Sequence, residues 1–111
     1  MKYKNQKSAE LIAILNECAA TCRFCSVASL NEETVKSMVS SIKSNLDCSE
    51  MCNLLASYLS RNSAHASHLL KECIEICEAC ATECEKHPHM DHCRECAETC
   101  RKCAEACKNA L

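Results

Sequence analysis

The sequence of 111 residues contains no glycine, no tryptophan and only one proline, Pro88. Turns and loop-rich scaffolds normally depend on glycine and proline, so their near absence argues against a fold built mainly from loops. Aromatic residues are also scarce, with one Phe and two Tyr, which leaves Leu, Ile, Ala and Cys to form the core. The composition favours helices joined by short turns.

Neither sign of charge dominates the chain. The formal net charge is −2, and acidic and basic residues are interspersed, so there is no basic stripe for nucleic acid and no polybasic segment for a membrane surface. Near the N-terminus the only apolar run is residues 11–15, between Glu10 and Glu17. We therefore expect no nucleic-acid or membrane partner, no signal peptide and no membrane-spanning segment.

What the sequence does have is cysteine, with 14 in the whole chain. A cysteine share above ~8 to 10% in a short chain often marks a secreted disulfide scaffold. That class is loop-rich and exported, whereas this chain lacks turn residues and shows no export signal. We therefore expect a cytoplasmic protein whose thiols stay free in a reducing environment.

Turn signals divide the chain into four helical segments within a single domain, residues 1–111. We expect helices at about Ser8 to Ser29, Asn31 to Ser60, Ser63 to Lys86, and Pro88 to Asn109. In this interpretation Asn31 caps the second helix ahead of Glu32 and Glu33, Asn62 or Ser63 caps the third, and Pro88 lies in the first turn of the fourth. Four helices with short connections predict an all-α, antiparallel, up-down-up-down four-helix bundle.

The cysteines repeat at alternating steps of three and four, as in the stretch CRECAETCRKCAEAC, which places them on the face of each helix that looks toward the bundle axis. The residues on these lines are Cys18, Cys22, Cys25, Cys48, Cys52, Cys73, Cys77, Cys80, Cys84, Cys93, Cys96, Cys100, Cys103 and Cys107. Antiparallel threading gathers leucines at one end, as a plug, and Cys25, Cys84 and Cys93 at the other end, as a mouth. The sequence thus predicts a core lined with sulfur.

Pairs of cysteines four residues apart suit metal binding better than disulfides. Their Cβ atoms lie ~5 to 6 Å apart on a helix, whereas a disulfide needs roughly 3.8 Å. Thiolates select Cu(I), Zn(II) or iron-sulfur clusters, and zinc and iron-sulfur sites are usually built on loops or knuckles. Cu(I) accepts two or three thiolates. If neighbouring ions share sulfurs, the capacity approaches one ion per cysteine, a ceiling of about 14 ions. Such a filled core is electroneutral, because each Cu(I) ion balances one thiolate.

Two alternatives to Cu(I) storage follow from the same residues. A zinc or mixed-metal thiolate buffer would use the same ligands at a lower stoichiometry. A thiol-redox or iron-sulfur protein would use the Cys-x-x-Cys spacings, although the βαβ pattern that accompanies the redox motif is absent. Neither the storage nor the buffer interpretation requires an enzyme.

Taken together, the four predicted helices, the core-facing Cys-x-x-x-Cys pairs, the run HCRECAETCRKCAEAC and a His- and Met-rich mouth resemble the bacterial copper storage proteins of the cytosolic type. The resemblance implies a homotetramer of bundles that hold many Cu(I) ions, with all 14 cysteines as ligands. It also places His87, His89, Met38 and Met90 near the entrance. His92, four residues before Cys96, is within reach of the same place. The second helix departs from the pattern, because Ser41 and Asn45 occupy core positions where further sulfurs would fit.

Overall fold

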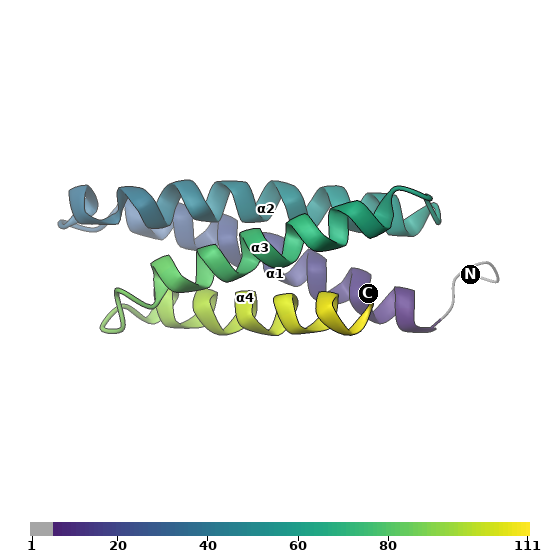
Figure 1. Ribbon diagram of the computed structural model, residues 1–111. Coiled ribbons are helices and arrows are strands. Elements are labelled where there is room, and N and C mark those ends of the chain that lie inside the picture. Colours follow the sequence, from purple (N-terminus) through teal and green to yellow (C-terminus); the bar gives the residue numbers. More distant parts are fainter. Residues whose placement is uncertain (1–5) are drawn as a thin grey trace.

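The structure, a computed structural model, describes residues 6–111, and these form helices and no strand. The elements are α1 (Gln6–Leu30), the short 3₁₀ helix η1 (Val35–Met38), α2 (Val39–Ser60), α3 (Ala66–Cys84) and α4 (Asp91–Asn109). The four α-helices run side by side along one long axis (Figure 1), and each packs against two others, α1 with α2 and α4, and α3 with α2 and α4. The predicted up-down-up-down four-helix bundle is confirmed.

The start of the second helix differs from the prediction. Asn31 does not cap α2, because its side-chain amide donates a hydrogen bond back to the carbonyl of Val27, at 3.2 Å, in the last turn of α1. Glu32 and Glu33 consequently lie in the connection, and η1 precedes α2. The Asn31 side chain, predicted to cap α2, thus forms a local hydrogen bond at the end of α1 instead.

The other two connections are also longer than predicted. Asn62 adopts a left-handed backbone conformation, with φ of 54°, which asparagine tolerates better than most residues. The Ser63 hydroxyl accepts a bond from the His65 N–H, and α3 starts only at Ala66. Pro88 lies outside α4, in a turn closed by the Met90 N–H and the His87 carbonyl at 3.1 Å.

The core of the bundle consists mainly of sulfur. All 14 cysteines are fully buried, with no exposed surface, and none forms a disulfide. The outward faces of α3 and α4 carry charge instead, including the ion pairs Lys108–Glu78 and Arg101–Glu85, which join the two helices. The predicted cysteine stripes are therefore confirmed on all four helices.

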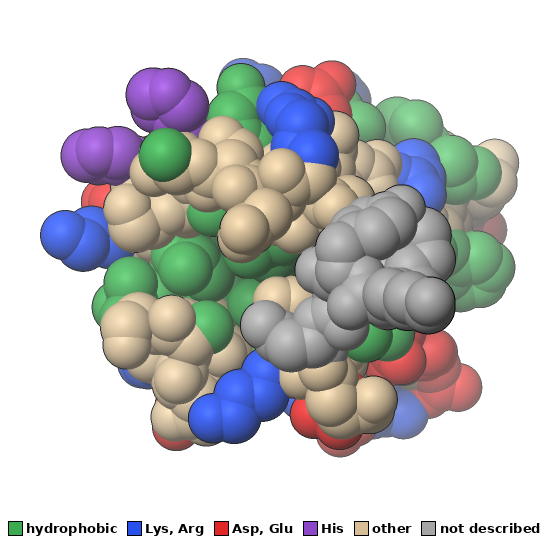
Figure 2. Space-filling view, turned by 90° about the vertical axis from the view of Figure 1, so that its right-hand side faces the viewer, with side chains coloured by type: hydrophobic (Ala, Val, Ile, Leu, Met, Phe, Trp, Pro, Cys, Tyr) green, Lys and Arg blue, Asp and Glu red, His purple; other side chains and the backbone are tan. Residues whose placement is uncertain are grey.

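Leucines close the end of the bundle that holds the start of α1 and the end of α4. Leu15 and Leu55 are fully buried there, and Leu11 and Leu70 nearly so. Figure 2 looks onto this end and shows hydrophobic side chains in a hollow. The hollow has a volume of about 540 Å³ and its walls include Leu11, Leu59 and Leu70. The leucine plug predicted from the sequence is present, with a shallow depression on its outer side.

The hydropathy of α1 departs from the expectation that no segment suits a membrane. Among the described residues, α1 alone is long and apolar enough to match a membrane span by length and composition, with a mean hydropathy of 1.4. Cys18, Cys22 and Cys25 contribute to that value, and the bundle buries all three against the other helices. Core packing thus accounts for part of the apolar character of α1, since the bundle buries 39% of this apolar stretch.

Candidate metal centre

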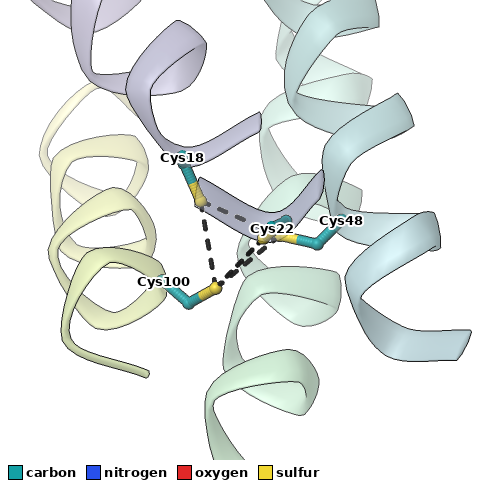
Figure 3. Close-up of side chains that lie close together, drawn as sticks. All are labelled: Cys18, Cys22, Cys48 and Cys100. Atoms are coloured by element: carbon teal, nitrogen blue, oxygen red, sulfur yellow. Dashed lines mark hydrogen bonds between the residues drawn. The ribbon is translucent and has the colours of Figure 1, made fainter. Parts of the chain in front are cut away.

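Thiols from three helices converge near the middle of the bundle (Figure 3). The Sγ atom of Cys100 lies 3.6 Å from that of Cys22 and 3.9 Å from those of Cys18 and Cys48. The Cys18 and Cys48 sulfurs are also 3.9 Å apart. Cys18 and Cys22 meet the other two because residues four apart lie on one helix face. The arrangement is a compact group of four sulfurs held by α1, α2 and α4.

This group is one of several that overlap along the axis. Within each group the sulfur atoms lie within 4.8 Å of one another. Five of these groups are Cys18–Cys22–Cys48–Cys100, Cys18–Cys48–Cys52–Cys77, Cys22–Cys80–Cys96–Cys100, Cys52–Cys73–Cys77–Cys103 and Cys25–Cys84–Cys96. Because neighbouring groups share members, ions held by adjacent groups would be bridged by common sulfurs. We call the 14 buried sulfurs of the core together the thiol column.

Asn45 brings the only amide into this column among the described residues, and it is fully buried. Its Oδ1 atom accepts hydrogen bonds from the thiols of Cys80, Cys96 and Cys84, at 3.1, 3.3 and 3.5 Å. Its Nδ2 group has no hydrogen-bond partner. Buried polar groups are nearly always satisfied, so the orphaned amide marks a position at which the hydrogen bonding of the core is not optimal.

At the opposite end from the leucines, His92 faces two thiols. Its Nδ1 atom lies 3.4 Å from the Cys25 Sγ and 3.5 Å from the Cys93 Sγ. The Nε2 atom of the same ring lies 3.3 Å from the Glu32 carboxylate. The mouth therefore contains a histidine that already contacts the last sulfurs of the column.

The four residues that the resemblance placed near the entrance are all at this end, in different surroundings. Met38 is fully buried at the end of η1, and Met90 packs partly buried against the core. His87 and His89 lie with their rings edge to face, 6.4 Å between centroids. In the described hydrogen bonds, His92 is the histidine that contacts thiols, and the clue in the sequence was its position next to Cys93 and four residues before Cys96.

Burial and close packing raise the pKa of thiols at both ends of the column. Burial, with the neighbouring Cys84, raises the pKa of the Cys93 thiol to about 11. Contact with Cys84 and Cys96, together with burial, raises the pKa of Cys25. Contacts with Cys103 and Cys73 raise that of Cys107 at the leucine end. These thiols are neutral near pH 7, so metal binding must displace their protons.

The fold and the column define a class of protein, a helical bundle whose interior offers many thiol ligands to soft metal ions. The family model of the copper storage protein matches residues 4–111. The chain belongs to the copper storage protein family.

Individual relatives agree with this assignment. The chain is 34% identical to the uncharacterized cysteine-rich protein YhjQ of Bacillus subtilis over 93 aligned residues. The alignment covers 84% of this chain and 85% of the relative. It is similar to a Streptomyces lividans cytosolic copper storage protein loaded with five coppers, at 36% identity and a TM-score of 0.92, over 96% and 92% of the two chains. It is also similar to the Cu(I)-bound copper storage protein BsCsp3, at 33% identity and a TM-score of 0.89, over 94% and 97%.

Proposed function

We propose that this chain stores multiple Cu(I) ions in the cytosol and thereby limits copper toxicity, with residues 1–111 acting as one metal-binding domain. The observation that carries the proposal is the thiol column, in which neighbouring groups of sulfurs share members. A chaperone or sensor needs one site, whereas overlapping groups along a whole bundle provide capacity. Storage requires no chemical transformation of a substrate, and we assign no catalytic role.

The proposed ligands are the 14 cysteines of the column, with histidine and methionine residues at the mouth. The mouth residues are His87, His89, Met38, Met90 and His92. Of these, His92 has the strongest structural support, since its ring contacts two thiols. The Oδ1 atom of Asn45, which three thiols surround, is a further candidate ligand.

Charge balance favours Cu(I) over zinc in this core. If every sulfur bridges two ions and every ion binds two sulfurs, the column holds one Cu(I) ion per thiolate. The single positive charge of each ion then balances one thiolate, so a filled column is neutral. Zinc at the same stoichiometry would leave a large uncompensated positive charge among buried groups, which is costly. A zinc-loaded column must therefore hold far fewer ions.

Anaerobic titration of the reduced protein with Cu(I), against a chelator competitor, tests the storage function. We expect the protein to take up many ions before the chelator is metallated, approaching the ceiling of about 14 set by one ion per sulfur. A parallel titration with Zn(II) should saturate at a small fraction of that number. Saturation with one or two Cu(I) ions would contradict storage, and tighter binding of zinc would indicate a zinc buffer.

We further propose that the chain assembles with copies of itself, as the tetramer of the resembled family implies. Large apolar side chains are exposed where the end of α1 lies beside the start of α2. These are Phe24 (65% exposed), Val27 (59%), Leu30 (59%), Val39 (45%) and Leu46 (50%), and Leu54 (43%) is exposed further along α2. Among the described residues, α3 and α4 expose no large apolar side chain. We call this surface the α1–α2 face; its apolar residues suit an interface that two copies share.

Light scattering after size-exclusion chromatography measures this assembly directly. The wild-type mass should be about four times the 12.3 kDa of one chain. The double substitution Phe24→Glu and Leu46→Glu should shift the protein to smaller species, because it buries charge in the interface. The control is Leu111→Glu, which changes a side chain of similar exposure outside the α1–α2 face. A monomeric wild type, or equal effects of both changes, would contradict the proposal.

A further inference from the structure

The carboxylate of Glu32 reaches the mouth from the connection between α1 and η1. It accepts a hydrogen bond from the Nε2–H group of His92, and this bond joins residues 60 positions apart in the sequence. The His92 side chain is 12% exposed and that of Glu32 is 37% exposed, so the bond lies at the boundary between the column and solvent. It ties the α1–η1 connection to the first turn of α4.

This bond determines which nitrogen of the His92 ring carries the proton. A neutral imidazole has one N–H donor and one acceptor nitrogen, and a carboxylate accepts only from the donor. With Nε2–H directed at Glu32, the lone pair of Nδ1 is directed at the Cys25 and Cys93 thiols, at 3.4 and 3.5 Å. A carboxylate in this position is a common means of fixing the orientation of a metal-binding histidine.

We propose that Glu32 is a positioning residue for copper acceptance, and this inference rests on the proposed storage function. By holding the His92 ring, Glu32 presents Nδ1 together with the sulfurs of Cys25 and Cys93 as a three-ligand site at the mouth. A Cu(I) ion that leaves a donor ligand for this site displaces one proton from each thiol it binds, and its oxidation state does not change. The ion then passes to the adjoining Cys25–Cys84–Cys96 group.

Three variants test this role. Glu32→Ala removes the acceptor, Glu32→Gln keeps an oxygen that can accept from Nε2–H, and Glu33→Ala changes the neighbouring exposed carboxylate. We expect Glu32→Ala to slow Cu(I) uptake from a chelator complex about ten- to hundredfold, by analogy with the loss of metal affinity or activity that follows removal of such a partner. Glu32→Gln should restore most of the rate, and Glu33→Ala should behave as wild type. The final number of ions bound should be the same in all four proteins.

A second measurement needs no copper and is therefore independent of the storage function. Nitrogen-15 NMR of the empty protein reports the tautomer of His92, which should be the Nε2–H form in wild type, Glu32→Gln and Glu33→Ala, and mixed in Glu32→Ala. Circular dichroism confirms that each variant is folded. A wild-type tautomer and uptake rate in Glu32→Ala would overturn the proposal, as would equal slowing by Glu33→Ala, which indicates a general effect of charge. A wild type that binds only one or two ions would instead contradict storage.

Discussion

Loading the reduced bundle with Cu(I) should raise its thermal unfolding midpoint by tens of degrees. Each of the five sulfur groups draws on three helices, so a bound ion links segments that separate on unfolding. The unfolded chain also binds Cu(I), and only the difference in affinity contributes to stability. If five ions each bind the folded chain tenfold more tightly, they add about 7 kcal/mol. At about 4 to 8 °C per kcal/mol for a small domain, the shift is tens of degrees.

Calorimetry of the empty and loaded protein, under anaerobic conditions, measures this shift. The matched variant replaces Cys18, Cys48 and Cys100 with Ser, which removes the group that joins α1, α2 and α4 and takes ligands from the two groups that share its members. Each protein is compared with its own empty form, so the cost of the substitutions cancels. In the variant, the rise in the unfolding midpoint on loading should fall by a larger fraction than the number of bound copper ions does. A shift below about 5 °C at saturation would show that the ions do not hold the helices together.

Replacing Asn45 with Cys should stabilise the empty protein by about 1 kcal/mol, even though a polar residue that accepts three hydrogen bonds is lost. The Nδ2 group of Asn45 is buried without a partner, and such a group costs about 1 to 3 kcal/mol. The bonds it gives up come from thiols, which are weak donors. The variant also carries an additional sulfur in the column, so its capacity should increase by about one Cu(I) ion.

Ser41→Cys provides the control, because Ser41 lies on the same stripe of α2 and is equally buried. Its hydroxyl is satisfied, since it donates to the carbonyl of Glu83 at 3.2 Å. This variant also adds a sulfur but relieves no orphaned group, so denaturant unfolding should show no gain in stability. A destabilised Asn45→Cys protein would mean that the amide has a partner in solution, such as an ordered water molecule. A stabilised Asn45→Cys protein would indicate that Asn45 lowers the stability of the wild type and is retained for copper binding.

The sequence predicted the parts of the site that depend on helical periodicity alone. Once α1 and α4 are helices, spacings of three and four require Cys18 and Cys100 to face the axis, whatever the details of the connections. The leucine plug follows from the same spacing combined with antiparallel threading. These predictions remain correct even when the predicted helix ends are wrong by several residues.

The mouth could not be predicted to the same extent, because it depends on the connections. Asn31 has two local hydrogen-bonding options, and the sequence does not show that it bonds to α1 instead of capping α2. The position of Glu32 follows from that choice, and so does its contact with His92 across 60 residues. Pairing between a connection and the first turn of a helix far along the chain has no periodic signature.

The leucine plug has a consequence for the order in which stored ions are exchanged. Leu15 and Leu55 close one end of the thiol column, and the Glu32–His92 pair lies at the other. If copper enters and leaves at the mouth, as we propose, an ion beside Cys73 or Cys107 must move through sites that other ions occupy. We therefore expect the most recently acquired copper to be the most readily withdrawn, and the oldest to form a slow reserve.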